Sequence, residues 1–296
     1  MTATPADAAA PGPAPGFTSG PTLGPLLHAT LIVGDLAPVT RAYAALGFTA
    51  HDAGTVESRQ ADAWGHAALA GCAVRWLTAP GRDAPLLRLI KRPGTPPRPT
   101  RLSHGWMALE LLVRDVDALA PQVTAAGFEI VGPPADLDVS PAIRALQAIG
   151  PAGEMLYLTQ VKAPVPPFAI PLSSALPPSA PIGPLFIAVL ATPSREVAVA
   201  ACGPWQPSAV LRFDTKITVL NRAHQLDNGH RWPVATVQWA GESLFEIDEV
   251  VLPGGATAAL SDHTLPAGLA WVTLRAARPQ CALAAIGPGA WIETVN

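Results

Sequence analysis

The stretch HATLIVGDLAPVTRAYAALGF, residues 28–48, returns later in the chain as MALELLVRDVDALAPQVTAAGF, residues 107–128. In both copies the aspartate of a Val-x-Asp turn, Asp35 or Asp115, is followed twelve residues on by Gly-Phe. A repeat with a fixed internal spacing indicates a duplicated structural unit. We therefore expect at least two copies of one module, and the rest of the sequence is interpreted from them.

Each copy has the pattern of a strand followed by a capped helix. Alternating positions of a strand face opposite sides of a sheet. One face of the first strand carries Leu27, Ala29, Leu31 and Val33, and the other carries His28, Thr30 and Ile32. In the second copy Met107, Leu109, Leu111 and Val113 share one face, and Trp106, Ala108, Glu110 and Leu112 share the other. Asp35 and Asp115 are suited to cap helices over residues 36–46 and 116–126.

The remaining segments complete a modular plan. Strands are expected at residues 68–78, 85–91 and 154–161, so each module is a strand, a helix and two or three further strands. A Pro-rich segment at 163–183 predicts a boundary between one domain at 25–162 and a second at 184–296. The second domain holds a third module with a strand at 185–190, a helix at 194–201 and strands at 210–219, 232–239 and 243–250. A truncated fourth module has strand, helix and strand at 271–275, 280–285 and 290–295.

Composition excludes several classes of protein. The net charge is −3 with no basic stripe, so the footprint of nucleic-acid binding is missing. No apolar run approaches the roughly 20 residues of a membrane span. The three cysteines are far apart and form no C-x-x-C pair, which favours buried thiols in a reducing cytoplasm. Residues 1–24 are rich in Ala, Pro and Gly and lack the apolar core of a signal peptide, so we expect a disordered tail.

The segment LLHATLIVGDLAPVTRAYAALGF resembles the opening of a module of the vicinal oxygen chelate superfamily, which includes glyoxalase I, bleomycin-resistance proteins and type I extradiol dioxygenases. The resemblance is good over residues 26–161 and weak over 183–296. It implies an α+β fold in which paired βαβββ modules form curved mixed sheets around a cavity. Two tandem domains are expected, the second one diverged and truncated.

The resemblance also implies where a divalent metal would bind. Family enzymes often use one His or Glu from the first strand and one Glu from the last strand of each paired module. His28 matches a first-strand position, but its counterpart is Ala108, and Arg88 and Tyr157 stand at the last-strand positions. An arginine cannot ligate a cation, so we expect no metal cofactor. The alternative is iron or zinc, with Glu246 and the nearby His224 and His230 as a second candidate set.

Several side chains of the expected cavity face could carry chemistry. Glu110 stands between two leucines and could be a carboxylate with a raised pKa that moves a proton, or half of an ion pair with Arg88. His28 could act as acid, base or hydrogen-bond donor, and Tyr157 could donate to an oxyanion. Substrate contacts are expected from Arg88, Thr30, Arg75 and Trp106. A structural role is the competing interpretation for each of these residues.

Three functions follow as hypotheses. The first is a metal-independent lyase or isomerase that uses acid–base chemistry on a small oxygenated substrate, aromatic compounds included. The second is a non-catalytic binding or resistance protein, and the third is a metal-dependent dioxygenase or glyoxalase. In each case the partner is a small molecule, and a homodimer is possible. We expect the ligand in the N-terminal domain, in a cavity that places His28 and Glu110 on one concave surface.

Overall fold

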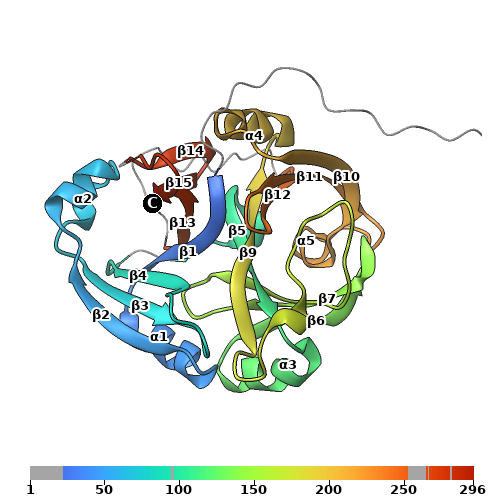
Figure 1. Ribbon diagram of the computed structural model, residues 1–296, viewed down its shortest axis with the longest axis horizontal. Coiled ribbons are helices and arrows are strands. Elements are labelled where there is room, and N and C mark those ends of the chain that lie inside the picture. The colour runs from blue at the N-terminus through green and yellow to red at the C-terminus, as the bar shows by residue number, and fades with distance from the viewer. Residues whose placement is uncertain (1–22, 95–96, 253–264, 266, 281) are drawn as a thin grey trace, which may run out of the picture.

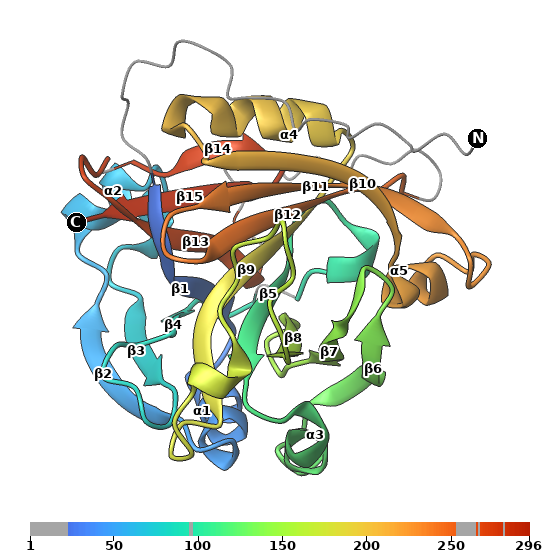
Figure 2. The ribbon, with the colours of Figure 1, turned by 45° about the vertical axis from the view of Figure 1, so that its right-hand side comes forward.

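The computed structural model describes residues 23–94, 97–252, 265, 267–280 and 282–296. Two strongly curved sheets lie side by side, with helices at the ends and outer edges of the pair (Figures 1 and 2). Parallel and antiparallel neighbours occur in both sheets. The expected α+β architecture of curved mixed sheets is therefore confirmed. The expected tail at residues 1–24 lies outside the described residues, apart from Leu23 and Gly24, which begin the first strand.

The first sheet has seven strands in the order β14-β15-β13-β1-β4-β3-β2. Its strands are β1 Leu23–Val33, β2 Thr49–Thr55, β3 Ala73–Thr78, β4 Leu87–Lys91, β13 Gly268–Ala276, β14 Ala284–Gly287 and β15 Ala290–Val295. Helix α1, Leu36–Ala45, connects β1 to β2, and the short α2, Ser58–Ala63, lies between β2 and β3. A 3-10 turn, η1 Ala67–Leu69, precedes β3.

The second sheet has eight strands in the order β10-β11-β12-β9-β5-β8-β7-β6. Its strands are β5 Gly105–Val113, β6 Glu129–Leu137, β7 Ser140–Ile149, β8 Met155–Val161, β9 Ile182–Thr192, β10 Ala209–Lys216, β11 Arg231–Trp239 and β12 Ser243–Glu249. Its helices are α3 Val116–Ala125, α4 Arg195–Cys202 and α5 Thr218–Ala223. Three further 3-10 turns are η2 Thr100–Leu102, η3 Ser173–Ala175 and η4 Gly203–Trp205.

The pairing of modules differs from the expectation. The first and second modules do not share a sheet: β1 pairs with β13 of the fourth module, and β5 pairs with β9 of the third. His28 on β1 and Glu110 on β5 therefore lie on different concave surfaces, not on one. The physical reason is that every module has an open edge at its first strand, and the sequence within a module does not specify which other edge completes the sheet. The division into domains at residues 163–183 stays a proposal.

The helix caps agree with the repeat. Asp35 accepts a hydrogen bond from the amide of Ala37, and Asp115 accepts one from the amide of Ala118. Gly47 and Gly127 end these helices with φ of 85° and 90°, in the left-handed region that glycine reaches without steric cost. The helix expected at 280–285 is wrong, because residues 284–287 form β14, which pairs with β15.

The core lies between the two sheets. One apolar cluster joins the convex faces of both sheets to α1, α3 and α4, and it includes Leu31, Leu111 and Phe245. A separate apolar cluster lies on the concave side of each sheet. Among the described residues, no helix is long and apolar enough to cross a membrane. The concave faces, where His28 and Glu110 point away from the shared core, are the places to look for a site.

Candidate functional site

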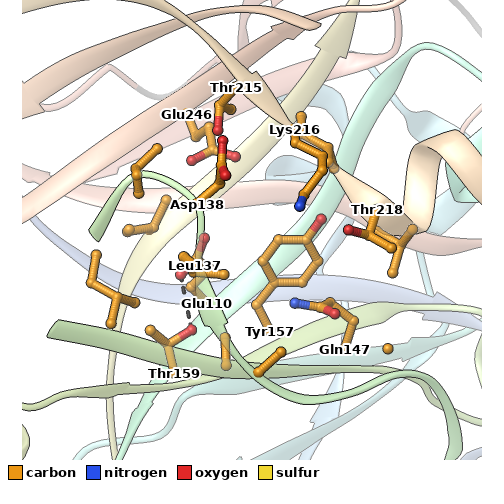
Figure 3. Close-up of a pocket in the computed structure, with 18 of the residues that line it drawn as sticks. Glu110, Leu137, Asp138, Gln147, Tyr157, Thr159, Thr215, Lys216, Thr218 and Glu246 are labelled. Carbon is orange, nitrogen blue, oxygen red and sulfur yellow. Dashed lines mark hydrogen bonds between the residues drawn. The ribbon is translucent and has the colours of Figure 1, made fainter. Parts of the chain in front are cut away.

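A cavity of about 540 Å³ opens within the eight-stranded sheet. It lies on the concave side of β5 and β8 and reaches the edge strands β6 and β10, with segments near residues 168–170 and α5 closing its flanks. Small-molecule sites usually occupy roughly 300–1,000 Å³ and are mostly apolar with a few polar groups. Figure 3 shows that Glu110, Tyr157 and Glu246 extend into this space from different strands.

Glu110 is the most strongly perturbed acid of the cavity. It lies on β5 next to Tyr157 on β8, is only 4% exposed, and its Oε2 accepts a hydrogen bond of 3.0 Å from the Thr159 hydroxyl. Burial, followed by repulsion from the Glu246 carboxyl, raises the pKa of Glu110 well above 4.5, although the bond from Thr159 opposes this shift. Burial therefore favours the protonated form of Glu110.

Glu246 supplies the second carboxyl. It lies on β12, pairs in register with Thr236 on β11 and Val189 on β9, and lines the same cavity as Glu110. Burial raises the pKa of Glu246 to about 7. The two acids titrate as a coupled pair, in which the ionisation of one disfavours that of the other. The cavity thus holds two buried carboxyls whose pKa values are both raised, that of Glu246 to about 7.

Tyr157 lines the same cavity, and Asp248 lies two residues after Glu246 on β12. The Tyr157 hydroxyl and both carboxyl oxygens of Asp248 are buried and have no hydrogen-bond partner within the described part of the chain. Burial, and then the carboxyls of Asp248, Glu246 and Glu110, raise the pKa of Tyr157 well above 10. Burial likewise raises the pKa of Asp248. The Tyr157 hydroxyl is therefore neutral near pH 7, and burial favours the protonated form of Asp248.

The other concave surface holds the remaining predicted residues, and their own side chains fill it. Arg88 on β4 donates to the Thr30 hydroxyl at 2.9 Å and to Glu293 Oε2 on β15 at 2.6 Å. Three tryptophan rings surround its guanidinium at 4.8–5.4 Å from their centroids, namely Trp64, Trp76 and Trp271. The expected pairing of Arg88 with Glu110 is wrong, because Glu293 is the partner of Arg88 and Glu110 belongs to the other sheet.

His28 lies beside this ion pair but is not charged. Its Nε2 is 3.9 Å from Glu293 Oε2, and its ring packs edge-on against Trp76. Burial, and then repulsion from Arg88, lower the pKa of His28 to about 3. Although burial favours the neutral acid, Arg88 and the hydrogen bond from Thr273 hold the pKa of Glu293 below its usual value. A neutral imidazole thus stands next to a carboxylate that a guanidinium neutralises.

Two other predicted contacts lie outside both sites. Arg75 on β3 pairs with the exposed Asp52 at 2.7 Å and donates to Thr40. Trp106 was assigned by alternation to the face of Glu110, but a register shift between Trp106 and Ala108 reverses that alternation. Trp106 is instead packed in the core between the sheets, where its Nε1 donates to the Trp291 carbonyl oxygen. A β-bulge of this kind has no clear mark in a strand that is apolar on both sides.

The positions implied for a metal do not supply a fitting ligand set in either sheet. In the eight-stranded sheet the first-strand positions, seven residues before each helix cap, are Ala108 and Ile187, and the last-strand positions are Tyr157 and Glu246. In the seven-stranded sheet His28 and Glu293 are present. The Arg88 guanidinium, however, donates to the Glu293 carboxylate that a metal would need as a ligand. Among the described residues no group of three His, Cys, Asp or Glu side chains is arranged to hold a metal ion.

The alternative metal set is also not assembled. The rings of His224 and His230 both pack against Trp232, at centroid distances of 5.2 and 4.7 Å. His224 Nε2 contacts the Arg101 carbonyl oxygen at 2.9 Å, and neither histidine lines the cavity that contains Glu246. The sequence did single out Glu246. It did not predict that Glu246 shares a cavity with Glu110, because that depends on the pairing of the second and third modules.

Comparisons with known proteins agree with this geometry. The family model described as the glyoxalase/bleomycin resistance protein/dioxygenase superfamily matches residues 26–143. This part of the chain belongs to that superfamily. Glyoxalase I from Zea mays has a similar structure, with a TM-score of 0.51 and 14% identity, over 86% of this chain and 75% of that one. A putative dioxygenase from Bacillus subtilis superposes with a TM-score of 0.52 and 13% identity, over 87% of this chain and 71% of that one. No curated protein matches.

These likenesses extend the superfamily fold to both halves of the molecule. The two solved structures cover the region beyond residue 143, where the family model does not match. At 13–14% identity they show the fold and not the chemistry. The resemblance read from the repeated segment is confirmed, and the reaction has to be argued from the cavity.

Proposed function

We propose that this chain is an enzyme of the superfamily that transfers a proton on a small oxygenated substrate, as an isomerase or lyase, without a metal. The observation that supports the proposal is the pair of unlike carboxyls in one apolar cavity. Glu246 has a pKa of about 7, and Glu110 has a pKa well above 4.5. Two acids whose environments separate their protonation states are suited to act as base and acid at the same pH.

The roles follow from these protonation states. The ionised Glu246 removes a proton from the carbon next to a substrate carbonyl, and the electron pair of that C–H bond forms a C=C bond. The carbonyl oxygen receives the proton of Glu110 and becomes an enol hydroxyl. When the neighbouring carbon carries a hydroxyl, the intermediate is an enediol. Glu246 then returns its proton to the former carbonyl carbon, and the other enediol hydroxyl gives its proton to Glu110, so that the C=C electron pair forms the new C–H bond and a carbonyl forms at the neighbouring carbon. The sequence favoured Glu110 as the base, and its retained proton now favours the acid role.

Metal independence is part of the proposal. It is supported by the donor sets, since Ala108, Ile187 and Arg88 stand where ligands would be needed. The participation of His28 is not favoured, because His28 belongs to the other sheet and is neutral beside an ion pair. Tyr157, whose hydroxyl is neutral and without a partner among the described residues, would stabilise negative charge that develops on the substrate oxygen.

The test is exchange of carbon-bound hydrogen in D₂O. A panel of α-keto acids and α-hydroxy ketones is incubated with the protein, and loss of the adjacent C–H signal is followed by proton NMR. Glu246→Gln keeps the shape of the side chain and removes the base, so exchange should fall by roughly 10²–10⁴-fold. Glu129→Gln, an exposed acid on β6, is the matched control and should exchange like the wild type. The wild-type rate should rise with pH through about 7, as Glu246 ionises.

Two outcomes would count against the proposal. Equal exchange by wild type and Glu246→Gln would remove Glu246 as the base. Panel compounds that bind in the cavity but exchange no hydrogen would instead support the second hypothesis, a protein that holds its ligand without turning it over.

A further inference from the structure

The opening of the cavity carries an uneven distribution of charge. The cavity lining becomes exposed along β6 and around the end of β10, where the exposed polar residues are Asp136, Asp138, Lys216 and Arg222. These two edges belong to different modules and face each other across the mouth. Four formal charges of this kind would cancel if all of them were free. Their ion pairs therefore decide the net charge that a ligand meets.

The two acids of the mouth are already neutralised. Asp136 pairs with Lys162 at 3.0 Å and with Arg144 at 3.4 Å, and Asp138 pairs with Arg231 at 2.8 Å. None of these three cations lines the cavity. The partners therefore approach the two acids from outside the mouth, and they leave it without free negative charge.

The two cations of the mouth have no such partners. Lys216 makes no hydrogen bond or ion pair with any other described residue. Arg222 donates only to the Val131 carbonyl oxygen, at 3.2 Å, and pairs with no described carboxylate. The mouth thus presents two uncompensated positive charges, while burial raises the pKa values of the carboxyls inside the cavity. A ligand with a negative group would be attracted to the opening and not to the floor.

The walls between mouth and floor are apolar and aromatic. Phe168, Phe186 and Phe213 line this space together with Ile170 and Leu244. The rings of Phe168 and Phe213 are in edge contact at 5.9 Å. Such walls suit a flat apolar body, since aromatic faces and edges pack favourably against another ring. The chemical character of the cavity therefore changes with depth. The mouth is positively charged, the walls are apolar, and the floor offers hydrogen-bonding groups.

We infer that the ligand of this cavity is an amphipathic organic anion, a compound with a carboxylate or sulfonate at one end, an aromatic or other flat apolar body, and an oxygen acceptor at the other end. Lys216 and Arg222 hold the anionic end at the mouth. The oxygen acceptor meets Glu110 on the floor, and this last element alone rests on the proposed function.

The experiment compares two fluorescent dyes that differ by one charged group. The probes are 8-anilino-1-naphthalenesulfonate and its uncharged relative N-phenyl-1-naphthylamine, titrated into the full chain at low and high salt. Lys216→Met keeps the apolar stem and removes the charge, and it should weaken the anionic dye by about 2–5-fold at low salt. The double variant with Arg222→Met should lose about 10-fold. High salt should shrink both effects, since exposed charges are screened.

The controls separate charge from fold and from chemistry. The neutral dye should bind wild type and both variants alike, which also reports that the cavity is intact. Lys91→Met, a cation on the other sheet paired with Asp35, should leave both dyes unaffected. Phenylalanine in place of Ala145, which lines the cavity from β7, should reduce binding of both dyes and so place them inside.

Binding that is independent of the charge at residues 216 and 222 would overturn the inference, as would an anionic dye that the Ala145→Phe variant still binds fully. Neither result depends on turnover. Glu246→Gln should slow hydrogen exchange by the factor given above and keep the preference for the anionic dye. The hydrogen-exchange experiment can therefore contradict the proposed function while dye binding supports the ligand class. Dye binding can likewise contradict the ligand class while exchange supports the proposed function.

Discussion

Arg88 shows how one side chain can close a potential site. Its guanidinium is buried, bonded to Thr30 and Glu293, and enclosed by three tryptophan rings. A cation delivered by the chain itself thus occupies the concave surface of the seven-stranded sheet. The equivalent surface of the other sheet has Tyr157 at the matching strand position and keeps an open cavity. Arg88 and the tryptophan rings around it thus fill a surface that stays open as a cavity in the other sheet.

The first prediction at this scale concerns the ion pair. Arg88→Met leaves the Glu293 carboxylate buried without its cation, and the free energy of unfolding should fall by about 3–5 kcal/mol. The double variant Arg88→Met, Glu293→Leu removes both charges and should recover most of that loss, since an apolar pair of similar volume is often as stable. Urea denaturation of the single variants and the double variant measures the coupling. A double variant no more stable than Arg88→Met would show that the tryptophan contacts, and not the charge pairing, dominate.

At the scale of the elements, the repeated helix endings can be tested directly. Gly127 follows α3 with a φ of 90°, and an added Cβ would meet no atom within 4 Å. Its replacement by alanine should therefore lower stability by about 1–2 kcal/mol through backbone conformation alone. Gly34, at the end of β1, has equally open space but no positive φ, so Gly34→Ala is the matched control and should be neutral or slightly stabilising. Similar urea midpoints for the two variants would reject the conformational argument.

The elements that the sequence predicted are those defined by neighbours in the chain. The caps at Asp35 and Asp115, the alternation around Leu31 and the helices after them depend on residues a few positions apart. The bulge at Trp106 and the strand β14 were missed because pairing with another strand determines them. The candidate site was half predicted: Glu110 and Tyr157 were named for it. Their partnership with Glu246 depends on β5 meeting β9, which no local pattern encodes.

At the scale of the whole molecule, a buried polar contact joins parts of the chain that belong to different sheets. The Tyr43 hydroxyl on α1 donates to Glu154 Oε1 at 2.9 Å, just before β8. Glu154 is fully buried and also accepts from the amide of Ala152. Burial raises the pKa of Glu154 to about 7, and the hydrogen bonds to Glu154 only partly oppose this shift. Ionisation of this carboxyl is therefore opposed by its burial between the two halves, although the bond from Tyr43 favours the ionised form.

A pH dependence of stability follows from this carboxyl. Because the pKa of Glu154 in the folded state is raised, its contribution is fully present below the unfolded value near 4.5 and is lost as pH rises through about 7. The loss should reach up to about 3 kcal/mol. Glu154→Gln cannot ionise, so its free energy of unfolding should fall less between pH 5 and 8 than that of the wild type. Glu129→Gln, at an exposed site, should retain the wild-type slope. Parallel slopes for Glu154→Gln and wild type would contradict the assignment.

The pairing of β1 with β13 sets the order in which the chain can be finished during synthesis. The second and third modules, which build the eight-stranded sheet and its cavity, are contiguous and lie between the two strands that meet in the seven-stranded sheet. The ribosome therefore releases the complete eight-stranded sheet while β1 is paired on one edge with β4 and its other edge still lacks β13, which begins more than 200 residues downstream. Contacts between such distant segments form slowly. The eight-stranded sheet, which holds the cavity, can therefore assemble first. The seven-stranded sheet, which holds the Arg88 ion pair, is completed last.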